Sequence, residues 1–209
     1  MSYRASFVQS ALTLVQLTEG VTAEQWSEPG LGVWDVRSLV GHASRALTTV
    51  IEYERLPSST SIDFETASDY FALLAGYKER EQTGAGDAEI AKRGVEAGRV
   101  LGEDPVAVVT DLVRAALQSA EATADDAVIV TRFGKLPFGE YLGTRVFELV
   151  VHGLDIARAT GQPVELINPV ALTETLALAT DISVRTRRGV DLLLAITGRQ
   201  PLDPGFSIT

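Results

Sequence analysis

The sequence predicts an all-α protein: a helical bundle with a long middle connection and additional short helices. Apolar side chains recur at helical spacing along most of the chain, and glycine and proline separate these stretches. Only Val128-Ile129-Val130 is typical of a strand. The chain has 209 residues, of which 45% are hydrophobic and 22% charged, enough for one good core. We therefore expect a single domain over residues 1–209.

Most predicted helices are bounded by residues that start or stop helices. Asp35 suits an N-cap, Pro105 suits a first helical turn and Gly161 suits a C-cap. Gly84-Ala85-Gly86 is expected to break the chain in its middle. The predicted helices cover, in order, residues 3–19, 36–55, 64–80, 87–101, 105–121, 139–160 and 168–188.

Two segments are predicted to be irregular. Residues 133–137 contain a glycine and a proline, so we expect them to end the strand at 128–130. Residues 198–209 contain two prolines and are expected to form an irregular tail.

Composition excludes several classes of function. The formal net charge is −10 and no basic stripe is present, so we expect no nucleic-acid partner. No signal peptide and no membrane-spanning stretch are visible, so we expect a cytoplasmic protein with no membrane association. Cysteine is absent, which excludes disulfides, cysteine-based zinc sites and a thiol nucleophile of the protein's own. Histidine and carboxylate side chains remain as metal ligands.

One side of the predicted helix 139–160 carries a polar stripe on an otherwise apolar helix. Its members are spaced by four, three, four and three residues, which places them on one face. Either this face meets water, or it lines an interior cleft of the bundle. The stripe consists of Tyr141, Arg145, Glu148, His152 and Asp155.

The chain has two histidines, and both lie on predicted helices. Glu148 and His152 are four residues apart, so both can reach one cation from one helix. His42 lies at the edge of the apolar face of helix 36–55, where a packed side chain and a metal ligand are both compatible with its position. If the three converge, two imidazoles and one carboxylate suit zinc, nickel, iron or manganese.

Two segments resemble the mycothiol-dependent maleylpyruvate isomerase family. Trp34-Asp35-Val36-Arg37-Ser38-Leu39-Val40-Gly41-His42 is similar to its W-x-V-x-x-L-x-x-H segment, and Arg145 to Asp155 is similar to its R-x-x-E-x-x-x-H-x-x-D segment. Leu194-Ala195-Ile196-Thr197-Gly198-Arg199 resembles a T-G-R tail common in that group. The resemblance covers nearly the whole chain.

The resemblance implies a DinB-like, YfiT-like four-helix bundle that holds one divalent metal, with zinc expected. Carried over by position, His42, Glu148 and His152 would be the ligands. The implied activity is that of a thiol S-transferase or an isomerase, with mycothiol as cosubstrate and a small-molecule substrate. The family's archetypal isomerase continues into a C-terminal domain, whereas this sequence stops soon after Arg199, so the substrate stays open. Related bundles often pair, so a homodimer is compatible, although no exposed apolar stripe requires one.

Several other side chains allow more than one interpretation. Arg145 could hold a substrate carboxylate or form an internal salt bridge with Glu148 or another acid. Asp155 could orient a ligand histidine, cap a neighbouring helix or meet Arg158. Tyr141 could donate a proton in the cleft or be an ordinary packed tyrosine, and Trp34 is expected to fill the core rather than to bind substrate.

Two other functions stay open: a hydrolase in which the metal activates water, and a non-catalytic metal-binding or regulatory module.

Overall fold

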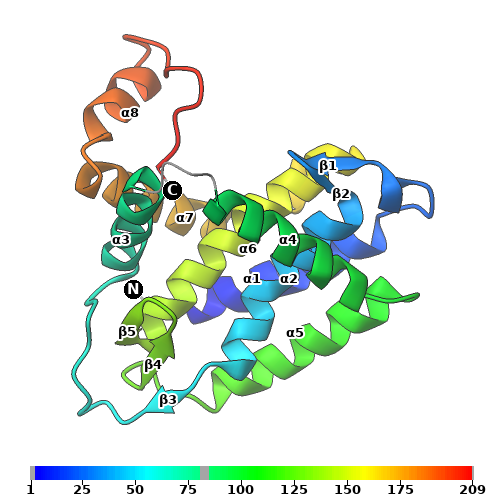
Figure 1. Cartoon of the computed structure of the whole chain (residues 1–209), viewed down its shortest axis with the longest axis horizontal. Helices are drawn as coiled ribbons and strands as arrows, with labels where there is room; N and C mark the ends of the chain where they lie inside the picture. The colour runs from blue at the N-terminus through cyan, green and yellow to red at the C-terminus, as the bar shows by residue number, and fades with distance from the viewer. Residues whose placement is uncertain (1–2, 81–84, 209) are drawn as a thin grey trace.

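The computed structural model describes residues 3–80 and 85–208, and within them it is mostly helical. The all-α class is confirmed. Four helices, α1, α2, α5 and α6, form the bundle (Figure 1). Helices α1 and α2 each pack on both α5 and α6. Their bounds are Arg4–Glu19 for α1, Val36–Glu52 for α2, Pro105–Glu121 for α5 and Phe138–Thr160 for α6.

The core lies between these four helices. Their inward apolar side chains are almost fully buried, which agrees with the helical spacing of apolar residues in the sequence. The largest of these side chains include Phe7, Leu14, Leu39, Leu47, Phe138, Tyr141 and Leu142.

Three predicted helix ends agree with the structure, at Asp35, Pro105 and Gly161. The Asp35 side chain accepts a hydrogen bond of 2.7 Å from the backbone N–H of Ser38, which caps α2. Pro105 occupies the first turn of α5. Gly161 ends α6 with a φ of 71°, a left-handed conformation that glycine adopts without strain.

The middle connection contains α3 (Ala67–Arg80) and α4 (Ala85–Val100). Helix α3 begins three residues later than predicted, because Glu140 accepts a hydrogen bond of 2.9 Å from the Ala67 N–H and fixes the N-terminus there. Of the predicted break at 84–86, Gly84 lies outside the described residues, and the other two already belong to α4. Helix α4 packs on the outer face of α2.

The prediction of a single strand was wrong. Residues 134–137, expected to break the chain, form β5 (Gly134–Pro137), which pairs antiparallel with β4 (Val128–Thr131). Gly134 has a φ of 140°, so the glycine that looked like a breaker instead closes a two-residue hairpin turn. Strand β3 (Arg55–Leu56) joins this sheet and ends α2 earlier than predicted. A second hairpin pairs β1 (Pro29–Leu31) with β2 (Trp34–Asp35), after the short helix η1 (Gln25–Ser27).

The C-terminal part departs from the prediction in one helix. Helix α7 (Pro169–Arg185) follows the 3₁₀ turn η2 (Val164–Leu166), packs on α3 and α6, and ends three residues before the predicted 188. An unpredicted helix, α8 (Gly189–Ile196), projects from the bundle and contacts α7 (Figure 1). No exposed apolar stripe was expected from the sequence, whereas α8 exposes Val190, Leu193 and Ile196.

The described residues after α8 form turns and irregular structure, as expected for the tail. Among the described residues, no helix is both long enough and apolar enough to cross a membrane.

Candidate metal centre

The structure brings together three side chains that are far apart in the sequence. His42 comes from α2, whereas Glu148 and His152 come from successive turns of α6. One potential ligand atom from each lies within 4.8 Å of the other two. The imidazole rings of the two histidines meet edge to face, with centroids 4.7 Å apart and planes at 87°. Two nitrogens and one oxygen at this spacing can surround one cation.

The polar stripe of α6 is not its water-facing side. The side chain of Glu148 is 30% exposed, that of His152 is 14% exposed and that of Asp155 is 23% exposed. The stripe faces α2, which crosses this side of α6 and contributes His42. Of the two predictions for this polar face, the one in which it faces the interior of the bundle agrees with the structure.

Hydrogen bonds along α6 hold His152 on both sides of its ring. Nδ1 lies 3.2 Å from Asp155 Oδ2, and Nε2 lies 3.3 Å from Glu148 Oε2. The structure thus places Asp155 against a histidine of the cluster. Among the described residues, Asp155 forms no ion pair with Arg158, which was one of the two alternatives for this side chain.

The three titratable groups have coupled pKa values. Burial lowers the pKa of His152, but hydrogen bonds to Asp155 and Glu148 outweigh burial and raise the pKa to about 9. Burial raises the pKa of Glu148, but the hydrogen bond from His152 and the charge of Arg145 outweigh it and lower the pKa to about 2. Burial and the neighbouring positive charge of His152 lower the pKa of His42 to about 4. Without a cation, the cluster at neutral pH is one imidazolium, one carboxylate and one neutral imidazole.

The donor set passes a test of fit for a divalent cation. His42 Nδ1 is buried and has no hydrogen-bond partner among the described residues. A buried polar atom without a partner is costly and rare, so this nitrogen has a free lone pair or proton that a further group can satisfy. Neutral imidazole and carboxylate are ligands that zinc and its neighbours in the transition series accept.

The comparison with protein families bears on the same residues. The model of the mycothiol maleylpyruvate isomerase N-terminal domain matches residues 8–157. The chain belongs to this family. The match includes α2 and all but the last turn of α6, and therefore all three side chains of the cluster, whereas α7 and α8 lie beyond it. Comparisons with curated proteins and with solved structures find no match.

The other two residues of the polar stripe, Arg145 and Tyr141, do not belong to the cluster, although the charge of Arg145 acts on Glu148. In this member of the mycothiol maleylpyruvate isomerase N-terminal domain family, the guanidinium carbon of Arg145 lies 4.8 Å from the centre of the Tyr141 ring, and its Nε donates to Thr144 Oγ1 at 3.0 Å. Among the described residues, Arg145 forms no ion pair within 4.0 Å with Glu148 or another acid, although its charge contributes to the lowered pKa of Glu148. Tyr141 is fully buried, which raises the pKa of its hydroxyl, and its ring packs near that of Tyr53. The structure places Tyr141 in the core and not beside the histidines.

Two neighbours of His42 were not predicted from the sequence. The Trp34 ring stacks on the imidazole, with centroids 4.4 Å apart and planes at 31°. Trp34 is 9% exposed, as expected for a core residue, but its eight-residue distance from His42 gave no sign of this contact. Arg45 lies one turn after His42, and its charge contributes to the low pKa of the imidazole. The spacing of three residues on one helix could have identified Arg45.

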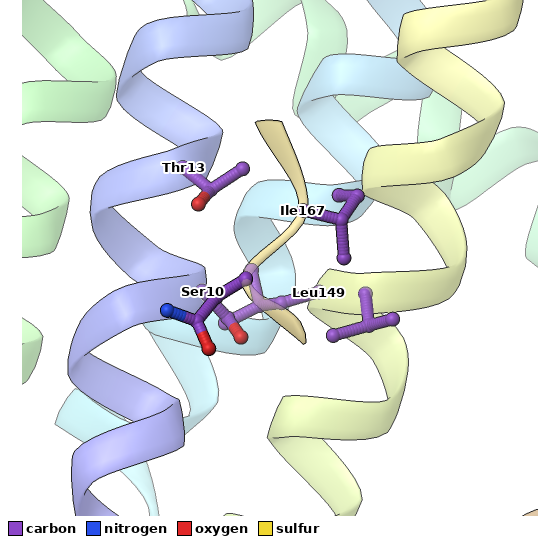
Figure 2. A pocket seen from close by; sticks show the side chains of 6 residues that line it. Ser10, Thr13, Leu149 and Ile167 are labelled. Atoms are coloured by element: carbon purple, nitrogen blue, oxygen red, sulfur yellow. The ribbon is translucent and has the colours of Figure 1, made fainter. Parts of the chain in front are cut away.

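A separate depression between α1 and α6 does not belong to the site. Figure 2 shows Ser10 and Thr13 of α1 facing Leu149 of α6 and Ile167. The space between them is too small for a water molecule. None of the residues that line this depression belongs to the cluster of His42, Glu148 and His152.

Proposed function

We propose that His42, Glu148 and His152 hold one divalent cation, with zinc as the first candidate and nickel, iron and manganese as alternatives. The observation that carries the proposal is the convergence of these three side chains from two helices within 4.8 Å. Three protein ligands leave further positions for water or substrate, an arrangement typical of catalytic sites.

We further propose that the protein is an enzyme that uses a low-molecular-weight thiol, with mycothiol as the cosubstrate that the family indicates. The chain has no cysteine, so the reacting sulfur has to come from outside. A free thiol has a pKa of about 8.5, so only a small fraction is thiolate at neutral pH. When bound, a divalent cation supplies the positive charge that deprotonates a coordinating thiol.

In this proposal, residues of the chain orient a metal-binding side chain and bind the substrate. Asp155 fixes the ring of His152 through Nδ1 and leaves Nε2 directed at the cluster. Arg145, which has no carboxylate partner among the described residues, is proposed to hold a carboxylate of the substrate through its forked N–H groups. The thiolate then adds to an activated double bond or displaces a leaving group.

Two outcomes of that addition define the candidate activities. In a thiol S-transferase, the adduct leaves as product. In a maleylpyruvate-isomerase-like reaction, rotation about the former double bond and elimination of the thiol regenerate the cosubstrate. The partners are a small-molecule substrate and a thiol in both cases.

Titration of cobalt-substituted protein tests this proposal. A change in the visible spectrum that mycothiol or cysteine produces, and that hydroxyl analogues of the same shape do not, is expected. A spectrum that responds only to oxygen anions would instead support a hydrolase that activates water. A spectrum that responds to neither would support a non-catalytic metal-binding or regulatory module.

A further inference from the structure

The two histidines of the cluster are held in place by different means. His152 has a carboxylate oxygen within 3.3 Å of each ring nitrogen. In the described residues, neither ring nitrogen of His42 has a hydrogen-bond partner, and Nδ1 is buried. A histidine that binds metal almost always has its second nitrogen fixed by a hydrogen bond. His42 lacks this restraint, and the indole of Trp34 stacks on its ring instead, 4.4 Å between centroids.

Trp34 is itself fixed by α4. Its indole Nε1–H donates a hydrogen bond of 2.9 Å to the backbone carbonyl of Ala91. One turn along α4, Gly94 faces the indole so closely that a Cβ there would lie 2.5 Å from Trp34 Cε2. The backbone of Trp34 is paired with Leu31 in the β1–β2 hairpin. The indole is therefore held between α4 and the imidazole of His42.

The position of α4 is determined by a close contact with α2. A Cβ on Gly41 would lie 2.2 Å from the backbone nitrogen of Gly98, so the two helix backbones touch without side chains between them. Gly41 directly precedes His42 in the sequence. Helix α4 thus approaches the cluster without contributing any of its three side chains.

We infer that Trp34 is a positioning residue for His42, and that α4, through Gly94 and the Ala91 carbonyl, sets the orientation of this imidazole. The inference rests on the proposed metal site. The outer torsion of histidine is broad, so an imidazole without hydrogen bonds would otherwise sample many orientations. A ring oriented in advance loses less conformational entropy when it binds an ion. Removal of an orienting partner typically costs about 10–100-fold in metal affinity.

Variants of Trp34 and Gly94 test the inference through zinc affinity, measured by competition with a chelator. We expect Trp34→Leu, which removes the stacked ring, to bind zinc about 10–100-fold more weakly than the wild type. Trp34→Phe keeps an aromatic ring on His42 and should recover most of the affinity. Gly94→Ala pushes the indole away from its place and should fall between them.

A matched control separates positioning from packing. Trp26 lies under the guanidinium of Arg37, at 5.2 Å, so Trp26→Leu removes an indole that stacks on a different residue. This variant should keep wild-type affinity, and thermal unfolding of each metal-free variant shows how far it remains folded. Equal zinc affinity for Trp34→Leu and the wild type would overturn the inference. Absence of zinc binding by the wild type would overturn the proposed metal site instead.

A measurement on the wild type covers the case in which the variants do not fold. Nuclear magnetic resonance relaxation of the two histidine rings in the metal-free protein reports their order. We expect the ring of His42 to be as ordered as that of His152, although it makes no hydrogen bond. A mobile His42 ring would overturn the inference.

Discussion

The two halves of the candidate site are organised in opposite ways. On α6, Glu148, His152 and Asp155 follow one another along one helix face, and His152 interacts with both carboxylates. On α2, His42 stands alone, and its orientation depends on Trp34 and α4. One half is built by local spacing and the other by tertiary packing.

This difference teaches which parts of a site depend on which parts of the fold. The α6 half needs only that its helix forms, because residues three and four apart share a face. The α2 half needs the β1–β2 hairpin, α4 and the glycine contact between α2 and α4 to be in place. Substitutions far from the site should therefore disturb the orientation of His42 more readily than that of His152.

The largest expected effect comes from removing either imidazole. His42→Ala and His152→Ala should each lose the metal, because two ligands from one helix or one ligand from each helix do not complete the site. The bundle should stay folded, since neither ring belongs to the apolar core. Metal analysis of the purified proteins checks this, with Arg158→Ala on the exposed side of α6 as the control. Stoichiometric metal in either histidine variant would contradict the assignment.

A smaller effect is expected at Asp155. Asp155→Ala leaves all three proposed ligands but frees the ring of His152, and should weaken zinc binding by about 10–100-fold. Affinity measured by chelator competition should fall, whereas Asp111→Ala, an exposed acid of α5, should leave it unchanged. If Asp155→Ala binds as tightly as the wild type, the hydrogen bond to His152 has no orienting role.

The pH dependence of metal binding follows from the raised pKa of His152. Because the metal-free protein keeps this proton up to about pH 9, an ion that binds His152 at pH 7 must displace it. Affinity should therefore rise with pH, about tenfold per unit below pH 9, with release of one proton. His42, whose pKa is about 4, is already neutral there. Calorimetric titrations with zinc in buffers of different ionisation enthalpy measure the number of protons released on binding. Zinc binding without proton release at pH 7 would contradict a protonated His152.

The smallest effect is expected at Arg145, which neither binds the ion nor pairs with Glu148. Arg145→Lys keeps the charge but loses the forked geometry, so KM for a carboxylate substrate should rise about tenfold, or about 1.4 kcal/mol. Turnover of acidic and neutral electrophiles with mycothiol gives the comparison, and Arg114→Lys, on the surface of α5, is the control. An equal loss for neutral electrophiles would argue against a carboxylate anchor.

Local signals explain what the sequence predicted well. Asp35 and Gly161 mark helix ends by their own chemistry, and the Glu148–His152–Asp155 spacing places three side chains on one face. Neither the hairpin at 128–137 nor α8 could be predicted in this way. Gly134 was interpreted as a breaker because its role depends on pairing with Thr131, and α8 is short and gains its place from contact with α7.

The environment of His42 lay beyond prediction for a physical reason. Its contact with Trp34 joins a strand residue to a helix residue, so no helical or strand period relates the two. The contact also requires α4, which is separated from α2 by the connection that contains α3. The family resemblance pointed to His42, whereas the means of holding it appeared only in three dimensions.

The edge-to-face meeting of the two imidazoles has a consequence for the bundle as a whole. His42 and Glu148 are more than one hundred residues apart in the sequence, and in an unfolded chain they rarely meet. A cation bound between them would act as a cross-link from α2 to α6 that exists only in the folded state. Zinc-loaded protein should therefore resist heat and denaturant better than metal-free protein, by an amount that grows with the free zinc concentration.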